Sequence, residues 1–78
     1  MKALDIAEDM KREIAKLVNN IGKGEKLEKV IDKADVIIKY RCGVNIATEV
    51  LRILEKLLSN AGLDAKYTRG KLKIKIEK

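Results

Sequence analysis

Alternating lysines near the C-terminal end are the residues of this chain with the clearest capacity for chemistry. In residues 71–77, lysines at every second position are separated by leucine and isoleucine. Such alternation is typical of a strand with one apolar and one charged face. Residues 64–68 and 35–41 alternate similarly, so we expect three strands that share one polar face. That face would carry Lys39, Arg41, Lys66, Thr68, Lys71, Lys73 and Lys75.

Cations gathered on neighbouring strands, which lie about 4.8 Å apart, repel one another. An anionic ligand would relieve that repulsion, and phosphate groups carry the required charge. We therefore predict phosphate contact through this face or through Arg69, in the tight hairpin turn Arg69-Gly70. An equally open alternative is that the lysines only guard the strands against edge-to-edge aggregation. Tyr40 and Tyr67 are both expected on the inward face, so binding should be directed at the backbone rather than at stacked bases.

A second candidate is Lys23 in the segment Gly22-Lys23-Gly24-Glu25. We expect a short helix after it, because Leu27, Val30, Ile31 and Ala34 recur at helical spacing. A helix N-terminus can hold a phosphate. The segment lacks the spacing of a nucleotide-binding loop, however, and a plain turn between helices is the favoured interpretation.

Catalytic chemistry has little support in this sequence. The chain has no histidine, so Cys42 cannot form a Cys–His pair within one subunit, and the usual Cys/His zinc set cannot be assembled. We expect no enzymatic activity, no cofactor and no metal. One cysteine excludes an internal disulfide and fits a reducing, cytoplasmic location. No apolar run is long enough to span a membrane, and the N-terminus does not resemble a secretion signal.

Length and charge narrow the class of protein further. Seventy-eight residues predict one domain, and so small a core makes a homodimer a natural way to bury more surface. The abundance of Lys, Glu and Ile resembles thermophile usage. The net charge is +6, and residues 64–78 alone contain six Lys or Arg against two Asp or Glu. This imbalance favours nucleic acid, either DNA or RNA, as a partner.

The predicted fold is an α+β two-layer sandwich in the order α-α-β-α-β-β. Helices are expected at 3–21, at about 27–34 and at 44–60, with strands at 35–41, 64–68 and 71–77. We place strand 71–77 between the parallel strands 35–41 and 64–68, antiparallel to both, in a mixed three-stranded sheet with the helices on one face. The single domain 1–78 would then divide into a helical part, 1–34, and a β-α-β-β unit, 35–78. Strand 35–41 would lie at an edge, open to pairing with a second copy.

The segment Val36-Ile37-Ile38-Lys39-x-Arg41, followed by Gly43-x-x-Ile46-Ala47-x-x-Val50, resembles part of the Alba family of small archaeal DNA- and RNA-binding proteins. In that family a Val/Ile-rich strand ending in Lys-x-Arg-Gly precedes a helix. The β-α-β-β ending also looks like the C-terminal domain of translation initiation factor three. The resemblance implies a homodimer and nucleic-acid contact at Lys39, Arg41 and Lys23. Cys42 is an extra residue relative to that pattern, and the family's long basic hairpin arm is reduced here to Arg69-Gly70.

The sequence thus predicts a non-enzymatic domain that binds the phosphate backbone of nucleic acid with little sequence specificity. The alternative is a self-associating or protein-interaction module, or a designed protein, without a nucleic-acid ligand. The clean patterning of idealised β-α-β-β designs is the basis for that alternative.

Overall fold

Two long amphipathic helices are formed by the segments in which apolar residues recur every three or four positions. In the computed structural model, which describes residues 2–78, these are α1 (Ala3–Asn20) and α3 (Val44–Asn60). The buried side of α1 carries Ala3, Ile6, Ala7, Met10 and Ile14, and that of α3 carries Ala47, Val50, Leu51, Leu54 and Leu58. Both helices were predicted at these positions, and the end of α1 differs by a single residue.

The C-terminal hairpin was also predicted correctly. Strands β2 (Asp64–Thr68) and β3 (Lys71–Glu77) pair antiparallel around Arg69 and Gly70. Both turn residues have positive φ, 51° at Arg69 and 78° at Gly70, as the type I′ turn of a two-residue hairpin requires. Leu72, Ile74 and Ile76 are buried, and the lysines between them are exposed.

Residues 26–32 form a strand, where a helix was predicted over 27–34. Strand β1 (Lys26–Asp32) pairs antiparallel with the whole length of β3. Leu27 and Ile31 lie opposite Ile76 and Leu72 on the inward face, while Val30 lies on the outward face and remains 47% exposed. The spacing of Leu27, Val30 and Ile31 looked helical only because an outward-facing valine stands beside an inward-facing isoleucine.

Residues 33–40 form a helix, so the predicted strand 35–41 was wrong. Helix α2 (Lys33–Tyr40) begins with a capping box: the Asp32 carboxylate accepts from Ala34 N (3.0 Å), and the Asp35 carboxylate accepts from Asp32 N (3.0 Å). The helix ends at Tyr40, and the backbone of the capping residue Arg41 is left-handed (φ 52°). Val36 is buried, whereas Ile38, two residues later, is 77% exposed. A strand would have placed these two side chains on the same face.

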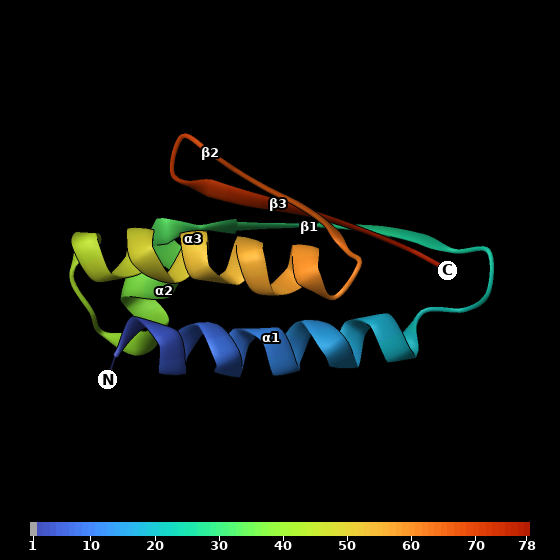
Figure 1. Cartoon of the computed structure of the whole chain (residues 1–78), viewed down its shortest axis with the longest axis horizontal. Coiled ribbons are helices and arrows are strands. Elements are labelled where there is room, and N and C mark those ends of the chain that lie inside the picture. Colours follow the sequence, from blue (N-terminus) through green and yellow to red (C-terminus); the bar gives the residue numbers. More distant parts are fainter. Residues whose placement is uncertain (1) are drawn as a thin grey trace.

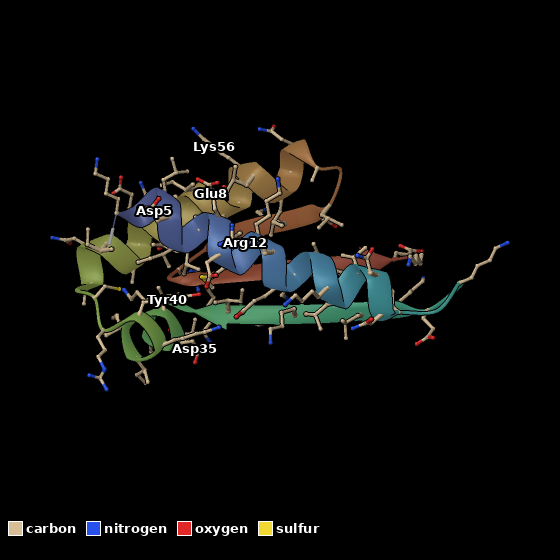
Figure 2. All side chains as sticks on the ribbon, turned by 90° about the horizontal axis from the view of Figure 1, so that it is seen from below. Asp5, Glu8, Arg12, Asp35, Tyr40 and Lys56 are labelled. Atoms are coloured by element: carbon tan, nitrogen blue, oxygen red, sulfur yellow. The ribbon has the colours of Figure 1, made fainter. Side chains whose placement is uncertain are left out.

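The resulting order is α-β-α-α-β-β, an α+β fold with a three-stranded sheet in the order β1-β3-β2. Strand β3 is central and antiparallel to both of its neighbours, as predicted. One of these neighbours is β1 instead of a strand at 35–41, and the sheet is wholly antiparallel instead of mixed. The helices cover one face of the sheet (Figure 1). Seen from the helix side, α1 crosses in front of the sheet between α3 and β1 (Figure 2). The predicted division at residue 34/35 therefore falls inside α2.

Candidate functional site

The face of the sheet that points away from the helices is divided into two halves of different charge. The central strand β3 supplies Lys71, Lys73 and Lys75 to this face, and the register determines what lies beside each of them. Lys75 lies between Glu28 of β1 and Asp64 of β2. This half therefore holds its lysine between two carboxylates, and Lys26 beyond it forms an ion pair with Glu77 (3.6 Å).

The other half has an excess of positive charge. Lys73 lies opposite Lys66 on one side and Val30 on the other, and Lys71 lies between Thr68 and Asp32. Side chains directly opposite on antiparallel strands have Cβ atoms about 5 Å apart, so the Lys66–Lys73 pair is a like-charge contact. These residues surround an open hollow of about 560 Å³. We call it the basic hollow, and its lining is Val30, Lys66, Thr68, Arg69, Lys71 and Lys73.

The basic hollow is only weakly neutralised by the protein itself. Glu28 reaches Lys73 at 3.6 Å, but both side chains are more than half exposed, so this ion pair contributes little to stability. The Asp32 carboxylate is engaged at the start of α2, where it accepts the Ala34 N–H. Lys66 and Arg69 form no ion pair with any residue between 2 and 78. The hollow can therefore attract an anion without first displacing a strong internal partner.

Helix α2 adds Lys33, which the sequence did not identify because residues 27–34 were assigned to a separate helical part. The turn and the helix are joined by a hydrogen bond from Lys33 N to Gly70 O (3.0 Å). The Lys33 side chain lies over the turn: a Cβ at Gly70 would meet its Cε at 3.2 Å. The absence of a side chain at Gly70 thus lets a lysine from the helix layer reach the end of the hairpin that carries Arg69.

Two of the predicted cations lie elsewhere. Lys39 is on α2, not on the sheet, and its Nζ forms an ion pair with Glu13 of α1 at 2.6 Å. Arg41 caps the C-terminus of the same helix and is exposed. Lys39 and Arg41, through which the family resemblance implied nucleic-acid contact, do not line the basic hollow. The strand implied by that resemblance is helix α2.

Lys39 belongs to a polar contact between α1 and α2. Tyr40 donates its hydroxyl proton to Asp9 Oδ2 (2.6 Å), and Arg12 reaches the other oxygen of Asp9 at 3.3 Å. The Tyr40 hydrogen bond is the main reason why the pKa of Asp9 lies below its usual value. Burial, and then the bond to Asp9, raises the pKa of Tyr40 well above 10. Figure 2 shows Tyr40 beside α1. This contact joins helices α1 and α2.

Lys23 lies at the opposite end of the molecule from the hairpin turn. The loop that carries it is beside the C-terminus in Figure 1, roughly 20 Å along β3 from Arg69. Glu25 folds back and accepts the Gly22 N–H at 2.8 Å, so the loop supplies its own carboxylate where a phosphate would bind. A strand follows the loop rather than a helix, so no helix N-terminus is available there. The segment is a turn, as favoured, but it leads from helix α1 into strand β1 and does not join two helices.

The described residues offer few other sites. No group of three His, Cys, Asp or Glu side chains between residues 2 and 78 could hold a metal ion. Nor does this part of the chain contain a helix long and apolar enough to cross a bilayer. Cys42 is half-buried against α2, with its Sγ 3.8 Å from Val36 O.

No family model, curated protein or solved structure matches the chain.

Proposed function

We propose that this chain is a non-enzymatic nucleic-acid-binding domain that contacts backbone phosphates through the basic hollow, with little sequence specificity. The observation that carries the proposal is the uneven charge of the outward sheet face. Lys66, Arg69, Lys71 and Lys73 gather at one half, where Asp32 lies beside Lys71 and Glu28 reaches Lys73 at 3.6 Å, so cations outnumber carboxylates. Lys33 approaches the same half from α2. Phosphate contacts of this kind supply affinity without reading sequence.

The positions of the tyrosines support a mode of binding that avoids bases. Tyr67 faces the helices, where the guanidinium of Arg52 lies 5.7 Å from its ring centre, and Tyr40 is held against α1. The described residues that line the basic hollow are lysine, arginine, threonine and valine, with no aromatic ring among them. Readers of single-stranded RNA usually stack bases on exposed aromatic rings. We therefore expect contacts with phosphates, and similar affinity for unrelated sequences.

A salt titration of binding tests the proposal. We expect the affinity for mixed-sequence duplex DNA to fall with salt along a log–log slope of about −3.6, since each of four phosphate contacts contributes about −0.9. Lys66→Gln should weaken binding and reduce the slope by about 0.9. Lys75→Gln is the matched control: it removes the same charge from the same face, but between Glu28 and Asp64, and should change the slope little.

Two results would contradict the proposal. One is the absence of any binding to duplex DNA or RNA at low salt. The other is an equal loss of affinity in Lys66→Gln and Lys75→Gln, which would mean that only net charge matters. The first result would favour the alternative, in which the lysines confer solubility and the chain is an interaction module. The second result would remove the basic hollow as the binding site. The same titration with duplex RNA distinguishes the two nucleic acids.

A further inference from the structure

Strand β1 leaves one edge of the sheet open to pairing. The hydrogen bond from Lys33 N to Gly70 O shows that odd-numbered residues here point their backbone groups toward β3. Even-numbered residues therefore point theirs outward, and the Asp32 N–H is indeed taken by Asp35 at the start of α2. Lys26, Glu28 and Val30 present their peptide groups at this edge, and none of the described residues accepts or donates a hydrogen bond there.

The other edge of the sheet is partly closed. Strand β2 has five residues, and the Tyr67 N–H on its outer side donates to Glu55 Oε2 of α3 at 2.5 Å. Arg52, one turn earlier on α3, lies against the Tyr67 ring. A strand whose outer N–H and C=O groups are free can pair with another strand, whereas a strand whose outer N–H is already bonded to a side chain is protected from pairing. An added strand would therefore join β1.

We propose that two copies of this chain pair through β1, antiparallel and two-fold symmetric about Lys29, to form a six-stranded sheet. In this register Lys26 lies opposite Asp32 of the second copy on the outward face, and Leu27 lies opposite its Ile31 on the inward face. Each contact occurs twice by symmetry. Glu28 and Val30 then exchange backbone hydrogen bonds, because both point their peptide groups at the free edge.

Charge and polarity select this register over its neighbours. Centring the pair on Glu28 would place that glutamate opposite its own copy and Leu27 opposite Lys29. Centring it on Val30 would place Glu28 opposite Asp32. A shift by one residue would bring inward and outward side chains together. Of these registers, the one centred on Lys29 is the only one that matches both a cation with an anion and an aliphatic side chain with another.

Lys29 itself opposes the pairing, since the register places it opposite Lys29 of the second copy on the inward face. An inward-pointing lysine is a known protection of edge strands. In this molecule the hollow beside Lys29 is also lined by two carboxylates, Glu13 and Asp35, and by one further cation, Lys39, so the like-charge contact is offset only in part. A contact along one strand is also small. We therefore expect a dimer that forms and dissociates with concentration rather than an obligate one.

Such a dimer would place both basic hollows on the same outward face. The two β3 strands would be separated by three strand spacings, about 14 Å. One continuous polyanion would then contact both basic hollows at once. This consequence rests on the nucleic-acid binding proposed above. The pairing itself does not rest on it, because it is derived from the β1 edge alone.

Sedimentation equilibrium of the protein alone, from micromolar to millimolar concentration, tests the pairing. We expect the wild-type chain to shift toward the dimer mass as concentration rises. Lys29→Thr should tighten the dimer at least several-fold by removing the like-charge contact. Lys16→Thr is the control, since it removes an exposed lysine on α1 and should leave the association constant unchanged. A wild-type chain and a Lys29→Thr variant that both remain monomeric at millimolar concentration would overturn the proposal.

A second variant tests whether the contact between the two copies lies on β1. Val30→Pro removes an N–H that faces the free edge and no hydrogen bond to β3, so we expect an intact circular dichroism spectrum and no dimer. Should this variant fail to fold, Lys26→Glu takes its place, because it sets a glutamate opposite Asp32 of the second copy and should weaken the dimer. A dimer that is unchanged in the folded variant would show that the interface lies elsewhere. Omitting nucleic acid keeps this result separate from a failure of the proposed function.

Discussion

Val36 and Ile38 provide a direct test of helix α2, because a helix and a strand predict opposite relations between them. In the structure Val36 is 1% exposed and Ile38 is 77% exposed. Val36→Ala removes two buried methyl groups, each worth about 0.8 kcal/mol, and leaves a small cavity. We expect a loss of about 2 kcal/mol in the free energy of unfolding, equivalent to a fall of roughly 8–16 °C in Tm for a domain of this size.

Ile38→Ala is the matched control, on the same helix and with a larger side chain removed. It should change stability by no more than about 0.5 kcal/mol, because the isoleucine is exposed and alanine favours helix. Urea denaturation followed by circular dichroism measures both variants. If residues 35–41 were a strand, Val36 and Ile38 would share its inward face and both variants would lose similar stability. Equal losses would therefore refute the helix and restore the alternation seen in the sequence.

Three further predictions concern Tyr40, Asp9 and Arg69. The pKa of Tyr40 is raised in the folded protein, so the unfolded chain loses its phenol proton at a lower pH than the folded chain does. The contribution of Tyr40 to the free energy of unfolding is therefore complete below pH about 10 and is lost as the pH rises above it. Tyr40→Phe should lessen the fall in stability above pH 10 in alkaline urea titrations, and Tyr67→Phe should retain it. The pKa of Asp9 is lowered, so its contribution to the free energy of unfolding changes with pH in the opposite direction. This contribution is present above pH 3.8 and declines as the pH falls below that value. Arg69 has a left-handed backbone that asparagine adopts more readily, so Arg69→Asn should raise stability by up to about 1 kcal/mol while weakening DNA binding; lower stability would show that the arginine side chain supports the turn.

The elements with a consistent pattern over their whole length could be predicted from the sequence. Helices α1 and α3 each keep an apolar side for seventeen residues or more, and β3 alternates without a break. The Arg69-Gly70 turn followed from Gly70 and the strands beside it. Because β2 and β3 were placed correctly, Lys66, Arg69, Lys71 and Lys73 were found as a group.

The middle of the chain could not be assigned from local pattern, because tertiary pairing decides it. Val36, Ile37 and Ile38 have strong strand propensity, yet their segment is a helix. A strand there would have set Lys39 and Arg41 beside the lysines of β3, adding like charges to a crowded face. Strand β1 instead brings Glu28 beside Lys75 and Asp32 beside Lys71. The one local signal for α2 was Asp32 followed by Asp35, a capping box in which the acid at the third position is aspartate rather than glutamate.

The hydrogen bond between Glu55 and Tyr67 has a consequence for how far assembly can proceed. A sheet with two equally reactive edges would add copy after copy and grow into a fibre. In this chain a glutamate from the helix layer already occupies the backbone of one edge. Growth would therefore terminate after a single addition, and Glu55→Ala is the substitution that we expect to convert a closed pair into an open-ended polymer.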